Sequence, residues 1–510
     1  MRANTLNVNQ MKKITVKTLA MTLMFVCAAV LSSCSCSRDK KDLMDCVPAD
    51  AAFVGMIDLS SAWDQLGIKS EGDDFTFAKE VKDLIKLAQI PNDAMDKIEG
   101  VLKCMEDTPK SIVVFSVDKH VWATFYVSDG DDFIKLMEDE AKADFDKEDG
   151  YQVWEKVAVK GNRVWFCDDM DTDELNRLLD LDKDRRFENK YEKVTEYLMA
   201  EDASTSFCMN FSYLKDYMQQ SEAQMLNLAM SFCFNDAQFL LYQSRLTDAE
   251  ATSEMRMFNS KEEPAQFLLP MAKIDAASLA KLDNESPLIA AIAINPDLVK
   301  KIQALAEKMG GLSPSDREIF EKLGHISGTS GFSFASASDA TLILNFNDAK
   351  TPAEVGQTIS LSSFFQTATA GNSLIVRLPG TPASGKGTLP SELVGQYAGI
   401  YLNPAKDGGK LVKGYDLAKL GKAWVVLGPD GNGVKLSSTW KVKTPLLTVI
   451  TEAMTIFRGF MDNSITFPGI EEMENITYSS TMAASPADSV YVSEDYSLYE
   501  EPVADSVAVW

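Results

Sequence analysis

Four stretches of this chain begin with the same pattern, an apolar run that ends in an acidic or amide residue. These four runs end at Asp58, Asn210, Asn295 and Asn403. Short apolar runs predict β-strands, and an Asx side chain can turn the backbone where a strand ends. In three copies a polar residue two positions later is expected to N-cap a helix. These residues are Ser60, Ser212 and Asp297.

Each opening is followed by two extended runs and then by a stretch with helical spacing. The paired runs cover 111–117 with 120–127, 237–246 with 251–259, 328–337 with 340–346, and 422–428 with 434–442. The helical stretches cover 131–141, 262–272, 351–361 and 444–457. Glycine-containing turns at 371–372 and 429–433 predict hairpins.

Further elements supplement this unit. Apolar spacing predicts helices over 77–88 and 95–105. A second hairpin, 151–159 with 162–168, leads to a short helix near 173–181. The pattern therefore predicts an α+β fold of repeated β-α-β-β-α units, with antiparallel sheets, helices on one face and two related halves. The expected segments are a signal peptide (1–33), an anchor and spacer (34–46), four modules (47–200, 201–283, 284–378 and 396–470), a loop between the third and fourth modules (379–395) and a C-terminal tail (471–510).

The first segment is patterned as a secretory signal peptide. Its basic residues, Lys12, Lys13 and Lys17, precede an apolar run over 19–31 that is too short to span a bilayer as a helix. The run ends in Leu31-Ser32-Ser33-Cys34, which resembles the lipobox of bacterial lipoproteins. This resemblance implies lipidation of Cys34. Because Ser35 rather than aspartate follows Cys34, the resemblance also favours attachment to the outer membrane. Which face of that membrane displays the protein stays open.

Beyond the anchor, the chain resembles an uncharacterised family of Bacteroides-type lipoproteins of similar length. The points of contact are the lipobox, the charged spacer over 37–42 and the start VPADAAFVGMIDL from Val47. The resemblance is one of layout along the whole chain. It implies a Bacteroidetes origin and no known activity.

The charge of the chain limits its partners. The net charge is −25, and removal of the signal, which contains Arg2 besides the three lysines and no acidic residue, makes it −25−4 = −29. Such a body repels phosphates, so no nucleic-acid partner is expected.

Cysteine and histidine usage gives no metal-site pattern. Six cysteines follow the anchor: Cys36, Cys46, Cys104, Cys167, Cys208 and Cys233. The chain holds no Cys-x-x-Cys pair and only His120 and His325, so neither a zinc site nor a cofactor is expected. Cys167, Cys208 and Cys233 lie in apolar runs and are expected to be isolated buried thiols.

One segment imitates a phosphate-binding loop. Residues 380–388, which end a strand-like run and contain Lys386, look like the loop of adenylate kinases. Pro390 falls where the following helix should run, and Arg458 is the only later arginine. We therefore interpret 379–395 as a Gly/Pro/Ser loop.

Other candidate sites are weak. Asp168, Asp169, Asp171 and Asp173 lack the glycine of a calcium loop, and N-capping by Asp171 or Asp173 explains them more simply. No catalytic residue is singled out. Five aromatic residues on strands are expected to be core, and the alternative is that an exposed set of them stacks on sugars: Trp122, Phe125, Tyr126, Trp154 and Trp165.

The C-terminal segment is acidic, rich in small residues and expected to be disordered. It contains Asp-Ser-Val twice, which resembles O-glycosylation acceptors of Bacteroidetes and makes Ser489 and Ser506 candidates. A partner-docking strand is the alternative reading of this segment.

The sequence thus favours a non-catalytic, lipid-anchored binding or scaffolding protein of the envelope. Its partners would be the membrane and an envelope protein or glycan. The alternative is an envelope enzyme or carrier that acts on glycan or peptide ligands.

Overall fold

A computed structural model describes residues 37–58, 69–71, 74–76, 111–141, 143–247, 249–309, 313–336, 338–360, 365–378, 381, 385–406 and 417–442. The chain divides into two units, Met1–Pro468 and Gly469–Trp510. All described residues belong to the first unit. The predicted helices over 77–88, 95–105 and 444–457 and the whole C-terminal segment lie outside the described residues.

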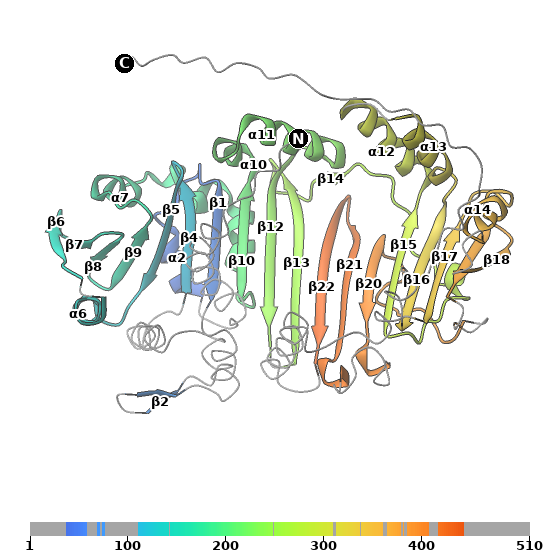
Figure 1. Ribbon diagram of the computed structural model, residues 1–510. Helices are drawn as coiled ribbons and strands as arrows, with labels where there is room; N and C mark the ends of the chain where they lie inside the picture. Colours follow the sequence, from blue (N-terminus) through green and yellow to red (C-terminus); the bar gives the residue numbers. More distant parts are fainter. Residues whose placement is uncertain are drawn as a thin grey trace, which may run out of the picture. The chain divides into compact units, whose positions relative to one another are not determined.

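Eighteen strands of the described residues form one antiparallel sheet (Figure 1). Its first half runs, in spatial order, through β6 (Asp146–Glu148), β7 (Tyr151–Trp154), β8 (Val157–Lys160), β9 (Arg163–Cys167), β5 (His120–Tyr126), β4 (Ser111–Val117), β1 (Phe53–Asp58), β10 (Thr205–Asn210), β12 (Ala237–Leu246) and β13 (Glu250–Asn259). It continues through β22 (Gly433–Lys441), β21 (Lys422–Asp430), β20 (Ala398–Leu402), β15 (Leu288–Ile294), β16 (Gly328–Ser336), β17 (Asp339–Asn345), β19 (Ser373–Arg377) and β18 (Gln366–Ala370). The predicted α+β class with an antiparallel sheet is confirmed.

The strands are not in chain order. The last three strands of the chain, β20 to β22, lie between β13 and β15. The two predicted glycine turns do close hairpins, with Gly371 between β18 and β19 and Gly431 between β21 and β22, at φ of +62° and +60°. These are values that glycine adopts without strain.

The Asx residues end their strands as expected, but the capping residue differs from the prediction. Asn210 itself caps α10 (Phe211–Leu214), because its side chain accepts a hydrogen bond from the Ser212 N–H at 3.1 Å. Asn295 accepts in the same way from the Asp297 N–H at 3.0 Å, at the start of α12 (Pro296–Met309). The predicted caps Ser212 and Asp297 are thus the donors, since each helix begins directly after its Asx residue. Ser60 lies outside the described residues.

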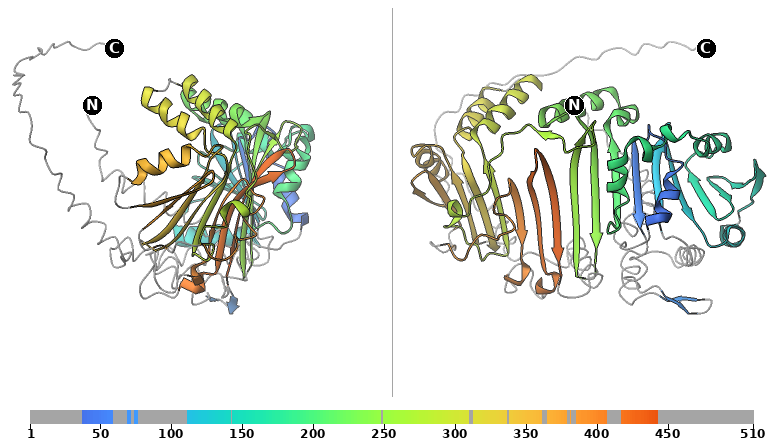
Figure 2. Two further views of the ribbon diagram at one scale, coloured as in Figure 1. Left: turned by 90° about the vertical axis from the view of Figure 1, so that its right-hand side faces the viewer. Right: turned by 180° about the vertical axis from the view of Figure 1, so that it is seen from behind.

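The two faces of the sheet, called face A and face B, are covered by different elements. Face A bears Val54, Cys208 and Leu241 in the first half, where they pack with α2 (Ser37–Met44), α7 (Thr172–Leu179), α8 (Phe187–Lys190) and α9 (Glu192–Leu198). The view from behind shows α2, in blue, in front of the blue strands (Figure 2). In the second half face A bears Ile289 and Tyr401, which pack with Leu279 of the 3₁₀ helix η3 (Ala277–Leu279) and with Leu282, Leu389 and Leu393 of irregular segments.

Face B is covered by helices at its two ends. α6 (Gly130–Ala141) packs Phe133 beside Val164 of β9, and α14 (Thr351–Ser360) packs Val355 and Ile359 beside Leu374 of β19. Helices therefore lie on both faces, and the predicted one-sided arrangement is wrong. The pleat allows this because successive side chains along every strand point alternately to face A and to face B.

The remaining helices, α10, α11 (Gln220–Cys233), α12 and α13 (Pro314–Leu323), lie at the upper strand ends in Figure 1. The predicted helix over 262–272 is wrong, because this stretch is extended. Its Gln266–Phe267 forms β14, which pairs with β11 (Phe234–Asn235). Two prolines, Pro264 and Pro270, disfavour a helix there.

Candidate functional site

An apolar groove of about 390 Å³ runs along face B in the second half of the sheet. The groove is lined by side chains that the pleat directs to face B. Ile400 of β20 lies opposite Val425 of β21, and Leu427 of β21 lies opposite Leu436 of β22. Ile400 and Val425 remain 52% and 44% exposed, although both are large aliphatic side chains. Contiguous exposed apolar surface of this kind commonly marks an interaction site.

The groove offers almost no hydrogen-bonding groups. Ser330 is the one lining residue with a polar side chain among the described residues. The backbone groups are engaged too, since β15, β20, β21 and β22 each pair with strands on both sides. A polar ligand would lose its hydration here without replacement, which costs free energy for every buried polar group.

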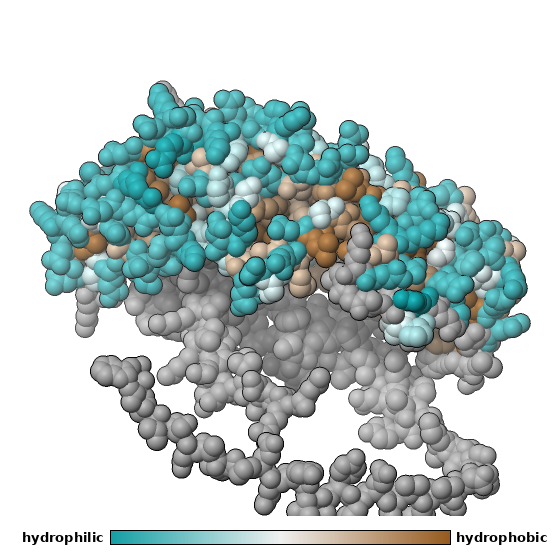
Figure 3. Space-filling model, turned by 90° about the horizontal axis from the view of Figure 1, so that it is seen from above, coloured by the Kyte–Doolittle hydropathy of each residue, from teal (hydrophilic) through white to brown (hydrophobic). Residues whose placement is uncertain are grey.

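Apolar side chains are also exposed at the helical end. Met225 and Leu228 of α11 are 62% and 38% exposed, and none of the residues of α11 is buried. Ile302 of α12 and Leu323 of α13 are likewise exposed. Seen from this end, apolar residues gather in the middle and polar residues surround them (Figure 3).

A polar hollow of about 400 Å³ lies near the turn that follows β13. Asn259 accepts hydrogen bonds from the N–H groups of Lys261 and Glu263, and Ser260 donates to Asp236 at 2.6 Å. These side chains therefore stabilise the turn itself, which limits what they could offer to a ligand.

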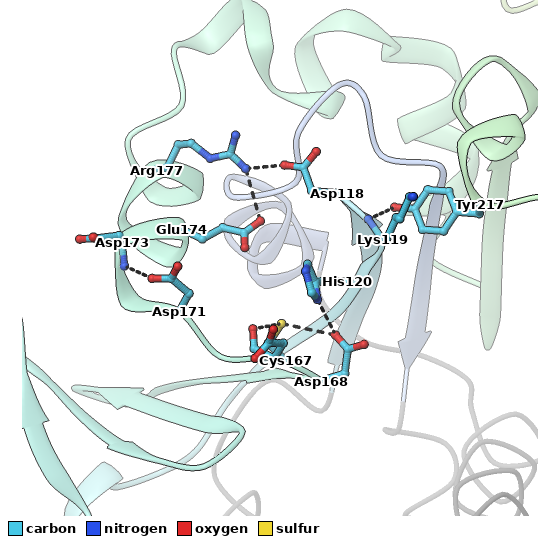
Figure 4. Close-up of polar contacts among 11 residues, drawn as sticks. Asp118, Lys119, His120, Cys167, Asp168, Asp171, Asp173, Glu174, Arg177 and Tyr217 are labelled. Atoms are coloured by element: carbon cyan, nitrogen blue, oxygen red, sulfur yellow. Dashed lines mark hydrogen bonds and ion pairs between the residues drawn. The ribbon is translucent and has the colours of Figure 1, made fainter. Parts of the chain in front are cut away.

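A compact polar cluster joins β5 to β9 (Figure 4). His120 begins β5, while Cys167 ends β9 and Asp168 follows it. The Asp168 Oδ1 atom lies 3.4 Å from Nδ1 of His120 and 3.6 Å from Sγ of Cys167. It also accepts the Val121 N–H at 3.0 Å. Burial opposes ionisation of Asp168, but the Val121 N–H and His120 outweigh it and hold the pKa of the carboxyl below its usual value.

An ion-pair network lies beside this cluster. Arg177 of α7 donates to Asp118 at 2.7 Å and to Glu174 at 3.3 Å. Burial raises the pKa of Glu174. Asp171 caps α7 by accepting the Asp173 N–H at 2.9 Å, so capping by Asp171 is confirmed.

The predicted thiols are free cysteines. Cys167 and Cys208 are buried as expected, whereas Cys233 is only half-buried. Burial raises the pKa of Cys167 to about 12. Of the aromatic residues on strands, Trp122 and Trp165 are core, with exposures of 0% and 3%, while Phe125, Tyr126 and Trp154 are half-buried.

In the described part of the phosphate-loop lookalike, residues 381 and 385–388, the backbone is packed rather than open. The Lys386 carbonyl accepts the Asn284 N–H at 2.8 Å, and a Cβ at Gly385 would collide with the Leu282 carbonyl oxygen. No helix occurs in the described stretch 385–403. The backbone of the loop thus contacts the 281–285 segment where a phosphate loop would contact its ligand.

The other predicted site residues, Cys34, Ser489 and Ser506, lie outside the described residues. Among the helices that the structure describes, none has the length and apolar character to cross a bilayer.

Comparison with known proteins gives little. No model of a known protein family matches the chain, and no curated protein matches its sequence. Among solved structures, crystal forms I, IV and III of TP0453, a Treponema lipoprotein, are similar at 11%, 11% and 8% identity. They cover 44%, 43% and 66% of this chain and 80%, 83% and 92% of TP0453, with TM-scores of 0.25, 0.26 and 0.27. Likeness at this level supports no conclusion about function.

Proposed function

We propose that this chain is a non-catalytic, lipid-anchored protein of the cell envelope that binds a partner protein through face B. The observation that carries the proposal is the apolar groove across β15, β20, β21 and β22. Its large side chains stay exposed while its hydrogen-bonding capacity is already used within the sheet. The free energy of binding would come from burial of these side chains, at about 25 cal/mol per Å² of apolar surface.

The groove favours an amphipathic helix as the occupant. Addition of a strand is excluded here, because every strand that forms the groove already has two neighbours. A bare hydrocarbon chain would keep one side in water, since the groove is open. An amphipathic helix instead buries its apolar face and turns its polar face to the solvent.

The alternative, an enzyme or carrier for glycan or peptide, finds less support. Such ligands need convergent polar groups, and the groove has only Ser330. The polar hollow near Asn259 has polar side chains, but they are engaged in a turn.

The lipid anchor and the cellular location are proposals as well. The lipobox supports lipid on Cys34, attachment to the outer membrane and membership of the Bacteroides-type lipoprotein family that the layout resembles. Metabolic labelling with a palmitate analogue tests the anchor. We expect the label to be lost in Cys34→Ala and kept in Cys36→Ala. Label that survives Cys34→Ala would refute this anchor.

We also propose that the sheet consists of two related halves that meet at β13 and β22. Outward from this pair, each side presents a long hairpin, two opening strands and a second hairpin. The hairpins are β12–β13 and β4–β5 on one side, and β21–β22 and β16–β17 on the other. An experimental structure tests this: failure of the two strand sets to superpose in the same order would refute common descent.

Site-directed photo-crosslinking in intact cells tests the groove. A photoreactive residue replaces Ile400 in the groove and, as a matched control, Val394, which is 41% exposed in the turn before β20. We expect adducts from position 400 only. Sequencing of the adduct should place the cross-link on an amphipathic helical segment of another protein, and Val425→Asp should abolish it.

Three results would contradict the proposal. Adducts of equal yield from both positions would indicate non-specific contact. An adduct on this chain's own residues would mean that the groove is filled from within. No adduct at position 400 would leave the groove without a partner in the cell.

A further inference from the structure

A second candidate site lies apart from the groove, where β5 pairs with β9. His120, Cys167 and Asp168 are three potential metal ligands of three different kinds, and their ligand atoms all lie within 4.8 Å of one another. They come from two paired strands, since Trp122 of β5 lies opposite Cys167 of β9. We propose that these three residues bind one divalent transition-metal ion, and that Zn²⁺ is the ion that fits them.

Two of the three distances between ligand atoms match a tetrahedral zinc site, and the third is within 4.8 Å. With Zn–N and Zn–O bonds near 2.0–2.2 Å and a Zn–S bond near 2.3 Å, adjacent ligands of a tetrahedron lie about 3.3 Å apart for nitrogen and oxygen and about 3.6 Å apart for sulfur and oxygen. The structure has 3.4 Å between Nδ1 of His120 and Oδ1 of Asp168, and 3.6 Å between Sγ of Cys167 and that same oxygen. A metal ion therefore needs no large movement of the strands.

The imidazole supplies a second, independent observation. The Nδ1 atom of His120 is buried and makes no hydrogen bond of good geometry, although it forms an ion pair with Asp168. The nearest acceptor, Oδ1 of Asp168 at 3.4 Å, is beyond the usual range of an N–H···O bond. A buried ring nitrogen whose one polar contact is this long is poorly satisfied, and coordination to a metal would remove that cost.

The carboxylate is held in place for coordination. The Val121 N–H donates to Oδ1 of Asp168 at 3.0 Å, so the backbone of β5 orients the ligand oxygen. Such support around the ligands is typical of metal sites. The Asp168 side chain is 50% exposed and that of His120 is 31% exposed. Solvent can thus reach the site, and a water molecule would complete the tetrahedron.

The ligand set selects the metal by its chemistry. Zn²⁺ binds imidazole nitrogen, thiolate sulfur and carboxylate oxygen together, whereas Ca²⁺ and Mg²⁺ require oxygen ligands. The surroundings are negatively charged as well. Asp118, Asp171 and Glu174 lie near the cluster, as do the basic residues Lys119 and Arg177, and Arg177 pairs with Asp118 and Glu174 (Figure 4). This charge favours a cation.

Binding must release a proton. The metal bonds to the sulfur of Cys167 as the thiol proton passes to water, so Zn²⁺ and Cys–SH give Zn–S–Cys and H⁺. We therefore expect affinity for Zn²⁺ to rise with pH through the neutral range.

Titration of the purified full chain with Co²⁺ tests the site. Co²⁺ takes the place of Zn²⁺ in tetrahedral sites and gives a thiolate-to-cobalt absorption band in the near ultraviolet. We expect one Co²⁺ per chain with this band, and its displacement by Zn²⁺. Cys167→Ser should abolish the band, and His120→Ala or Asp168→Asn should weaken binding by at least about tenfold. Cys233→Ser, which removes a half-buried thiol elsewhere, should change nothing.

The outcomes separate the site from a chance grouping. A folded wild-type chain without the band, judged by circular dichroism, would overturn the proposal. Persistence of the band in Cys167→Ser would assign the metal to another thiol. Unchanged affinity in both His120→Ala and Asp168→Asn would leave a lone cysteine and would also overturn it. His120 and Asp168 are partly exposed, so both variants should fold.

Discussion

Arg163 is a charged residue that lies almost completely buried in the core of the first half of the sheet. Its guanidinium donates to Asp45 at 2.9 Å, to Thr124 at 3.0 Å and to Cys46 at 3.1 Å. It also lies 5.1 Å from the ring centre of Trp165. Burial lowers its pKa, but the nearby Cys46 and Asp45 outweigh this and raise it. The fork geometry thus ties the segment after α2 to β5 and β9.

Replacement of Arg163 tests this tie. We expect Arg163→Lys to lower the free energy of unfolding by about 2–3 kcal/mol, because lysine cannot reach several acceptors at once and leaves them buried without partners. Urea denaturation measures the change. Arg177→Lys serves as the control, since its pair with Asp118 is more than half exposed and should contribute about 1 kcal/mol or less. Equal losses in the two variants would contradict this account.

The Cys46 thiol predicts how stability depends on pH. Burial raises the pKa of Cys46 from 9.0 to about 11. Between these values the unfolded chain loses the thiol proton and the folded chain keeps it, so the free energy of unfolding falls as pH rises. The loss is up to about 1.4 kcal/mol per pH unit for this group.

Urea denaturation across that range measures the effect. Cys46→Ala should have a shallower decline in the free energy of unfolding than the wild type. A decline of equal slope in both proteins would show that Cys46 does not contribute.

The cluster of His120, Cys167 and Asp168 marks the limit of sequence reasoning at this scale. The sequence contains no metal-ligand spacing, because 47 residues separate His120 from Cys167. Only the pairing of β5 with β9 brings them together. The apolar runs predict both strands, but they do not fix which strands pair or in which register.

Among the elements, hairpins follow from local sequence most directly. Gly371-Asn372 and Gly431-Asn432 each close a hairpin where the sequence predicts one, since positive φ at the first turn position requires glycine. The helix expected over 262–272 fails for a physical reason. Phe267 finds its partner in Phe234, with ring centres 5.3 Å apart, and Pro264 and Pro270 interrupt any helical hydrogen bonding.

The hairpin turn gives a prediction for β21 and β22. Gly431→Ala should lower the free energy of unfolding by about 1–2 kcal/mol, because a side chain is strained at φ of +60°. Thermal denaturation followed by circular dichroism measures the shift. Asn432→Ala at the neighbouring position, which does not have positive φ, should cost less. The reverse order would contradict the assigned turn geometry.

At the scale of the whole described sheet, one strand pairing joins distant parts of the chain. β13 and β22 pair over Glu250–Arg256 with Lys435–Lys441, and Ser253 and Ser438 share a hydrogen bond of 2.7 Å. Alternating runs predict the strands and the α+β class, but no local signal predicts this pairing. The groove could not be foreseen for the same reason, because Ile292, Ile400 and Leu436 come from strands that only the complete sheet places together.

The central claim is that the groove on face B is free in the isolated protein and covered by a partner in the cell. The reaction rate of a cysteine at position 400 with a maleimide measures this directly, with the wild type as background and Val394→Cys as control. We predict that Ile400→Cys reacts fast in the purified chain and slowly in intact cells, while Val394→Cys reacts at similar rates in both. Slow reaction of Ile400→Cys in the purified chain, or equally fast reaction in cells, would contradict the account.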